Sequence, residues 1–264
     1  MPEGDTIHRA AARLRPALEG ATLLRFEAPR LAGPRPRVGE RIEAVTAIGK
    51  HLQVDFSGGI TLETHMRMTG SWHVVRQGAR WPKPPHLMRC ALVVEGYQAV
   101  CFSAPVVRTF PTSAKGTASD PIVHLGPDLV LDNGSPEADA AVVELCVSRM
   151  RGLDPATPIG EVLLDQRVGN GIGNVYKSDV CWIEQVDPFA PLSSVDEATR
   201  ARLIATASRL LRANLGPGRR RTVAEGLAVY GRRGSPCRRC GAPIRKNTRG
   251  ELARITYWCA NCQI

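Results

Sequence analysis

The chain has 264 residues, of which 43% are hydrophobic and 23% are charged, and its formal net charge is +10. This composition is typical of a globular protein, and no apolar run approaches the roughly 18 residues needed to cross a bilayer. Charged residues recur from the third position onward, which excludes a signal peptide. We therefore expect a soluble, intracellular protein, and the length suggests two domains.

The first element expected is an amphipathic helix over residues 6–18, with Asp5 or Thr6 as its N-cap and Gly20 at its end. Its apolar positions fall on one helical face: Ile7, Ala11, Leu14 and Leu18. Pro2 and Glu3 then lie at the positive end of this helix, which disfavours a protonated amine and favours a bound phosphate.

The first three residues are Met1-Pro2-Glu3. If Met1 is removed, Pro2 presents a secondary amine followed at once by a carboxylate. A terminal amine titrates near pH 7.7–8 and a lysine near 10.4, so the terminus is the easier amine to use as a nucleophile. The alternative is that Pro2 is simply a tolerated first residue.

Residues 22–110 predict short strands separated by turns rich in glycine and proline, which favours a sandwich or barrel. The expected strands are 22–27, 41–48, 51–56, 60–63, 71–75, 90–94 and 99–102. Gly49-Lys50 connects two of them, and Lys50 alone would be interpreted as a solvated turn residue. The stretch 78–86 is expected to be an exposed loop.

The pattern changes after residue 111, because 112–136 has the composition of a linker. Helices are expected at 138–150, 158–166, 175–185 and 195–215, the last with a capping box formed by Ser194 and Glu197. Before the third of these, residues 169–174 contain three glycines in five positions and end in Asn174. This loop can bind a phosphate through backbone N–H groups, or it can be a plain structural turn.

Most of the excess positive charge lies near the C-terminal end: residues 219–254 contain eleven Arg or Lys against two Glu. Such a block attracts a polyanion, whereas a merely solvated tail would lack the cysteines found here.

The cysteines of this region form two C-x2-C pairs separated by 18 residues, Cys237/Cys240 and Cys259/Cys262. This spacing predicts one structural Zn²⁺ ion on four thiolates. Cys90, Cys101, Cys146 and Cys181 are expected to be buried, inert thiols.

Together these stretches resemble the formamidopyrimidine-DNA glycosylase / endonuclease VIII family over essentially the full length. The resemblance is carried, in the order of the family, by MPEGDT at the start, AIGKHL around Lys50, THMRMTGSW at 64–72, LLDQRVGNGIGNVYKSD at 163–179 and RITYWCANCQ at 254–263. It implies a bifunctional DNA repair enzyme that removes a damaged base and then cuts the strand by β,δ-elimination. Pro2 would attack C1′ of the damaged nucleotide, Glu3 would shuttle protons, and Lys50 would contact phosphate and assist catalysis.

The resemblance also implies a set of DNA-binding residues. Asn174 matches the phosphate-binding asparagine of a helix-two-turn-helix, and Arg254 matches the finger arginine that clamps phosphates beside the lesion. Met68, in the loop 65–69 with Arg67, matches the wedge that fills the gap left by an extruded nucleotide; a core methionine is the alternative. Asp179 falls where relatives usually carry a glutamate near the active site.

The sequence departs from the family in two places. Thr6 stands where relatives commonly have a second glutamate. The stretch 105–110 replaces the Pro-Arg-Arg-Phe-Gly segment with which the purine-specific branch supplies further wedge residues. Both the missing segment and the MPEGD start favour the endonuclease VIII branch, and hence oxidised pyrimidines and abasic sites over 8-oxoguanine.

We therefore expect an α+β fold in three parts. They are an N-terminal catalytic β-sandwich with a leading helix (1–123), a helical helix-two-turn-helix domain (124–226) and a four-cysteine zinc finger (227–264). The expected partner is damaged DNA, with no membrane, and the expected state is a monomer in the cytoplasm at the nucleoid. Three alternatives stay open: a catalytically silent zinc-finger DNA-binding protein, a lyase with little glycosylase activity, and a zinc-ribbon RNA-binding or ribosome-associated protein.

Overall fold

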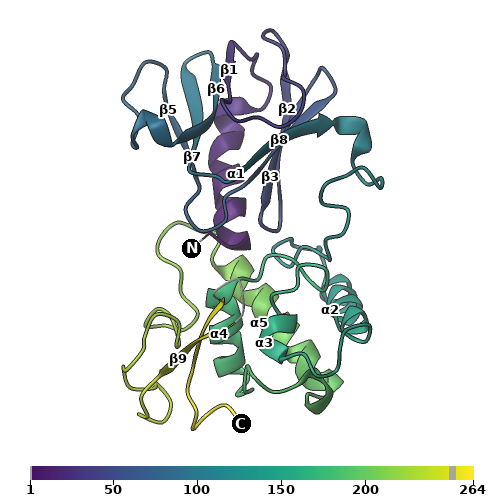
Figure 1. Cartoon of the computed structure of the whole chain (residues 1–264), viewed down its shortest axis with the longest axis vertical. Coiled ribbons are helices and arrows are strands. Elements are labelled where there is room, and N and C mark those ends of the chain that lie inside the picture. Colours follow the sequence, from purple (N-terminus) through teal and green to yellow (C-terminus); the bar gives the residue numbers. More distant parts are fainter. Residues whose placement is uncertain (1, 250–253) are drawn as a thin grey trace. The chain divides into compact units, whose positions relative to one another are not determined.

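The computed structural model describes residues 2–249 and 254–264 (Figure 1). The chain forms two compact units, the first ending at His124 and the second running from Leu125 to Ile264. Among the described residues, no helix combines the length and apolarity that a membrane span requires.

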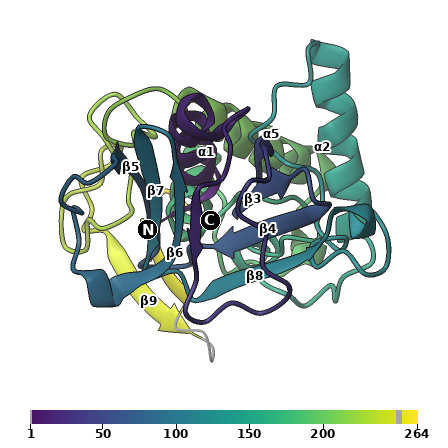
Figure 2. The same ribbon diagram turned by 90° about the horizontal axis from the view of Figure 1, so that it is seen from above.

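The first unit contains one long helix, α1 (Gly4–Leu18), and two four-stranded antiparallel sheets. One sheet has the order β1-β6-β7-β5 and the other β2-β3-β4-β8. Their strands are β1 (Arg25–Glu27), β2 (Ile42–Ile48), β3 (His51–Phe56), β4 (Ile60–His65), β5 (Ser71–Arg76), β6 (Met88–Val94), β7 (Tyr97–Phe102) and β8 (Val106–Pro111), with short 3₁₀ turns η1 (Pro85–Leu87) and η2 (Thr112–Ala114). Figure 2 shows α1 running alongside both sheets, and it contacts strands of each.

The core of this unit lies between α1 and the inner faces of the sheets, which confirms the predicted sandwich with a leading helix. The apolar face of α1 is fully buried, and it packs with strand residues such as Ile42, Leu52 and Phe56. Burying one such side chain contributes about 1.5–3 kcal/mol, so the helix is held mainly by this face. The outer face of β2-β3-β4-β8 carries polar residues instead.

Two details of this unit differ from the prediction. The helix begins at Gly4, with Glu3 as its N-cap, because Gly4 and Asp5 are themselves buried and belong to the first turn. Strand β8 was missed, since Pro105 and Pro111 at its two ends resemble loop residues. Pro111 is tolerated there because it is the last residue of a strand at the sheet edge.

The second unit contains α2 (Pro136–Met150), α3 (Ile159–Val162), α4 (Asn174–Ile183), η3 (Leu192–Ser194), α5 (Glu197–Ala213) and the hairpin β9 (Arg245–Arg249)/β10 (Arg254–Trp258). Its larger core joins α2 to α5 around residues such as Met150, Tyr176 and Leu203. A smaller core lies under the hairpin and combines Trp182, Val229 and Ile244 with three of the finger cysteines.

Helix ends in this unit also correct the prediction. The Ser194 capping box is wrong: Asp196 caps α5 by accepting the N–H of Thr199 at 2.7 Å, and Ser194 lies in η3. The helix expected over 158–166 is only α3, because the chain tightens afterwards into i→i+3 hydrogen bonds such as Leu164 N–H to Glu161 O.

Candidate functional site

Buried acidic side chains lie at the first turn of α1. The backbone carbonyl of Glu3 accepts the N–H groups of Thr6 (2.9 Å) and Ile7 (3.2 Å), so Glu3 begins the helix. Glu3 and Asp5 are both 0% exposed, and Pro2 immediately before them is half-buried. The Thr6 hydroxyl donates to Asp5 at 3.3 Å. The positive end of the helix stabilises negative charge at these positions, and the sequence therefore places a carboxylate directly beside residue 2.

Lys50 lies in the two-residue turn between β2 and β3, as predicted. The strands pair up to Ile48 and His51, so the turn is closed tightly by the ladder. Gly49 has φ +53°, a left-handed conformation that glycine adopts without steric penalty. The ammonium group is thus carried on a short connection between two strands of the sheet.

The loop between β4 and β5 presents one methionine and buries another. Met66 is 2% exposed and belongs to the core, whereas Met68 is 60% exposed at the tip of the loop. The N–H of Gly70 bonds Met66 O at 2.8 Å, and any Cβ at Gly70 would meet Met66 backbone at 2.6 Å. Arg67 is exposed and has φ +44°. The loop is therefore a tight turn that holds a large apolar side chain in solvent, which is what a wedge requires.

Behind the Lys50 turn, two histidines face each other across β3 and β4. The ring centroids of His51 and His65 lie 4.6 Å apart in an edge-on arrangement, and His65 Nδ1 accepts the N–H of Arg67 at 3.1 Å. Burial lowers the pKa of His65 to about 4, and the positive charges of His51, Lys50 and Arg67 add to this effect against the opposing Glu63. His65 is consequently neutral in the folded protein at ordinary pH.

This histidine makes the protein sensitive to acid. The folded pKa of about 4 lies below the ordinary value of 6.5, so the unfolded chain binds more protons between these values and stability falls as pH drops through that window. Denaturant unfolding from pH 7 to pH 4 should show a loss of about 2–3 kcal/mol from this group. His65→Gln should flatten that slope, whereas His124→Gln, in an exposed stretch, should keep it; equal slopes for wild type and His65→Gln would contradict the assignment.

In the second unit, Asn174 is the first residue of α4, and Gly173 is its N-cap. Lys177, one turn later and 2% exposed, donates to Asn174 Oδ1 at 3.4 Å, to Thr256 Oγ1 at 2.7 Å and to Ile255 O at 3.0 Å. One buried ammonium therefore joins the start of α4 to strand β10. Sequence reasoning missed Lys177, because its partners lie almost eighty residues away in the chain.

Arg254 begins β10 opposite Arg249 in the register. Its side chain lies outside the described part of the structure, and its predicted contact with phosphate stays a prediction. The neighbouring strand β9 presents the exposed cations Arg245 and Lys246.

Asp179 is held by hydrogen bonds within the second unit. Its side chain is 0% exposed, and its predicted place near the active site stays a prediction. It accepts the hydroxyl of Thr222 and the backbone N–H groups of Ala228 (2.8 Å), Val229 (3.0 Å) and Tyr230 (2.8 Å). Burial raises the pKa of this carboxyl, and the four hydrogen bonds oppose that effect. Asp179 therefore anchors the loop 222–230 to α4.

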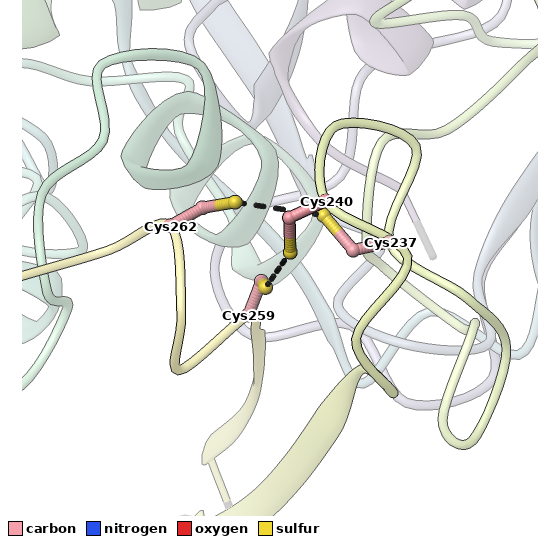
Figure 3. Close-up of side chains that lie close together, drawn as sticks. All are labelled: Cys237, Cys240, Cys259 and Cys262. Carbon is pink, nitrogen blue, oxygen red and sulfur yellow. Dashed lines mark hydrogen bonds between the residues drawn. The ribbon is translucent and has the colours of Figure 1, made fainter.

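The four predicted metal ligands converge at the base of the finger (Figure 3). Their Sγ atoms all lie within 4.8 Å of one another, with Cys237 and Cys262 at 3.8 Å and Cys240 and Cys259 at 3.5 Å. Zn–S bonds of 2.3 Å in a tetrahedron imply sulfur separations of about 3.8 Å. The donor set and its spacing therefore fit one tetrahedral metal ion.

The surroundings of Cys237 favour the thiolate that a metal needs. Burial opposes ionisation, but the backbone N–H groups of Arg239 and Cys240 and the indole of Trp182 lower the pKa of Cys237 to about 6. Trp182 Nε1 lies 3.3 Å from this sulfur. The remaining cysteines are all 0% exposed, which confirms that they are buried: Cys90, Cys101, Cys146 and Cys181. Burial raises the pKa of Cys101 and Cys181 to about 12, so they are inert.

The predicted residues thus form two groups. Pro2, Glu3, Lys50, Arg67 and Met68 lie in the first unit, and Asn174, Asp179, Arg254 and the cysteines lie in the second. Within the second unit, Lys177 connects Asn174 to the strand that begins with Arg254.

Comparison with known proteins is consistent with this arrangement. Residues 1–110 match the family model of the formamidopyrimidine-DNA glycosylase N-terminal domain. The chain is 41% identical to a probable endonuclease 8 2 of Streptomyces coelicolor, covering 100% of this chain and 94% of that protein. It is 34% identical to the DNA-(apurinic or apyrimidinic site) lyase Nei2 of Mycolicibacterium smegmatis, covering 100% and 99%. The crystal structure of the MutM (Fpg) protein from Thermus thermophilus superimposes with a TM-score of 0.77 at 26% identity, covering 99% and 98%.

A β-sandwich with a leading helix, followed by a helical unit that ends in a four-cysteine finger, is the architecture of a DNA repair glycosylase family. The chain belongs to the formamidopyrimidine-DNA glycosylase / endonuclease 8 family. Within it, the branch that it joins is that of endonuclease 8.

Proposed function

We propose that the chain is a bifunctional DNA glycosylase and AP lyase of base excision repair that acts on oxidised pyrimidines and abasic sites. The observation that carries the proposal is the Pro2-Glu3 pair at the start of α1, with Glu3 fully buried at the positive end of the helix. A protein that only bound DNA would have no use for an N-terminal proline followed by a buried carboxylate.

The chemistry begins when Met1 is removed and the Pro2 nitrogen becomes a free secondary amine. Its lone pair attacks C1′ of the damaged nucleotide, the bond from C1′ to the base breaks, and the base leaves and takes a proton from water. The proton of the attacking amine passes to the Glu3 carboxylate, which gives it to the sugar ring oxygen as the ring opens, and a cationic iminium forms between Pro2 and C1′. The iminium acidifies the C2′ hydrogen, so loss of that proton expels the 3′ phosphate; loss of the C4′ proton then expels the 5′ phosphate.

Access to C1′ requires that the nucleotide be turned out of the duplex, which costs a few kcal/mol. Met68, 60% exposed on its tight turn, is suited to fill the gap in the stack, with Arg67 beside it as a cation. Lys50, Asn174 and Arg254 are assigned to the phosphates around the lesion. Asp179 is left out of this set, because its carboxylate is occupied within the second unit.

The metal of the finger is proposed to be a single structural Zn²⁺ held by Cys237, Cys240, Cys259 and Cys262. The finger presents the basic strand β9, and its role is to hold that surface in shape for damaged DNA. We place the protein in the cytoplasm, as a monomer at the nucleoid.

A second candidate function is an AP lyase with little glycosylase activity. Thr6 supplies no second carboxylate, and its hydroxyl is directed to Asp5. The M. smegmatis relative is named for its lyase activity alone. Both observations weaken the case for efficient base removal without touching the Pro2 chemistry.

The test is borohydride reduction of the enzyme mixed with duplexes that carry an abasic site, thymine glycol or 8-oxoguanine. Reduction fixes the iminium as a covalent adduct, which is counted on a denaturing gel. We expect adducts on the abasic and thymine glycol duplexes, and at least about tenfold less on 8-oxoguanine, the discrimination that one misfitted contact provides. Adducts on the abasic duplex alone identify the second candidate. No adduct on any duplex contradicts both candidates and leaves a DNA-binding protein.

A further inference from the structure

An ion-paired carboxylate lies on the outer face of the sheet β2-β3-β4-β8, close to the Lys50 turn. Glu63, on β4, is 0% exposed. On one side, His51 Nδ1 of β3 lies 2.7 Å from Glu63 Oε1. On the other side, Arg108 of β8 donates from Nε to Oε2 and from Nη2 to Oε1, both at 3.0 Å. One carboxylate therefore joins three neighbouring strands.

This network is an unusual way to stabilise a sheet. Removing a carboxylate from water costs several kcal/mol, and apolar residues of the same volume as a buried ion pair often stabilise a fold as well or better. Burial by itself raises the pKa of Glu63, but His51 and Arg108 outweigh it and hold the pKa below its ordinary value. Glu63 is thus held as a carboxylate, and its directional hydrogen bonds fix geometry more than they add stability.

Two functional segments start from this network. His51 directly follows Lys50, so the bond from His51 to Glu63 fixes the end of the Lys50 turn. The ring of His51 also packs edge-on against His65, and His65 in turn accepts the N–H of Arg67. The same carboxylate is therefore linked by three successive contacts to the backbone of the loop that carries Met68.

Arg108 completes the argument. It lies in the stretch 105–110, which replaces a wedge-bearing segment of the purine-specific branch. Here its guanidinium makes two hydrogen bonds to Glu63, while 35% of the side chain stays exposed. Arg108 therefore braces β4 within the first unit.

We infer that Glu63, with His51 and Arg108, is a positioning residue that sets the Lys50 turn and the Arg67–Met68 wedge loop in their working geometry. The inference rests on the proposed function, in which Lys50 contacts phosphate and Met68 enters the stack. Substitution of Glu63 should slow the covalent step at Pro2 and the insertion of Met68, while the finger and strand β9 still bind DNA.

The test compares Glu63→Gln with Asp55→Asn. Asp55 lies at the far end of β3 on the same face and also holds a cation, Lys115, at 2.7 Å, so it is a matched, partly buried ion pair away from the turn. Two measurements are made: the single-turnover rate of borohydride trapping on an abasic duplex, and the fluorescence of 2-aminopurine opposite a non-cleavable tetrahydrofuran site, which rises when a wedge enters the stack.

Glu63→Gln should trap about tenfold or more slowly, since small displacements of positioned groups have effects of that order, and should lose most of the fluorescence rise. Asp55→Asn should match wild type in both. Arg108→Met is the second variant, in case Glu63→Gln does not fold, and should give the same losses; unfolding of both variants would make the network a stability element and overturn the inference. Folded variants that match Asp55→Asn in both measurements would also overturn it.

Failure of wild type to trap is instead a failure of the proposed function, and the fluorescence comparison still decides the positioning role.

Discussion

A chain in which a two-residue Gly-Ser extension precedes Pro2 will form no borohydride adduct with abasic DNA. The extension converts the Pro2 nitrogen into an amide, whose lone pair is delocalised and cannot attack C1′. Trapping should fall to background, because the new α-amine on the added glycine is displaced from Glu3 by two residues, roughly 7 Å of extended chain, and the lysines, with pKa values near 10.4, are poor substitutes at neutral pH. The measurement is single-turnover trapping beside non-covalent binding of the same duplex.

The matched control carries the same two residues after Ile264. It should trap like wild type, and both extended proteins should bind DNA within about twofold of each other, since neither change alters the phosphate-contacting cations. Intact mass must show that Met1 is absent from the wild-type protein. An N-terminally blocked protein that still trapped at the wild-type rate would assign the nucleophile to another amine.

Glu3→Gln tests the proton transfer by Glu3 separately from the attack by the Pro2 amine. The amide keeps the size of the buried side chain at the start of α1, but it cannot donate and recover a proton. Strand cleavage should slow by about 10²–10⁴-fold, the range of general acid–base catalysis, while the amine remains able to react. A rate unchanged by this substitution would remove Glu3 from the mechanism.

The sequence predicted those features of the fold and site that depend on residues close together in the chain. The cysteine pairs are set by short spacings, and the four sulfurs do converge. The helix face of α1 follows from a 3.6-residue period, and its four apolar residues are buried. The start of α1 was misplaced because Asp5 and Thr6 are both residues that favour the N-cap position; in the structure the Glu3 carbonyl accepts the N–H groups of Thr6 and Ile7, so the helix begins earlier.

Contacts that depend on the register between strands could not be predicted from the sequence. Glu63 and Arg108 are 45 positions apart, and they meet only because β4 pairs with β8 in one particular register. Since β8 itself was missed, its partner could not be foreseen. Asp179 shows the same limit: its hydrogen bonds to residues 222–230, more than forty positions away, could not be predicted from the sequence. Lys177 likewise finds its partners on β10.

Removing the metal from the finger should unfold it and weaken DNA binding. The small core beneath β9 and β10 contains few large apolar side chains beyond Trp182, Val229 and Ile244, and three of its members are cysteines. A core of that size does not order a segment of this length without a metal or disulfides. Structural zinc contributes about 10–16 kcal/mol of apparent binding free energy in finger peptides, so we expect most of the stability of this region to come from the proposed ion.

Wild type should contain one zinc per chain, and Cys240→Ser, which removes one thiolate, should lose it during chelator dialysis. Trp182 reports the change directly, because its indole lies 3.3 Å from Cys237 Sγ and its ring stacks against Arg239 at 4.2 Å. We expect a shift in tryptophan fluorescence and about a hundredfold weaker binding of abasic duplex, with a shallower salt dependence, since the cations of β9 are no longer presented together.

The matched control is Cys146→Ala, which removes a buried thiol from the larger core of the same unit. It should keep one zinc and its DNA affinity, although it is less stable by the loss of a packed side chain. If Cys240→Ser retained zinc, fluorescence and affinity, three thiolates would suffice and the tetrahedral assignment would be wrong. If it lost zinc but bound DNA as wild type does, the finger would hold metal without serving the DNA surface, and the basic strand β9 would need another role.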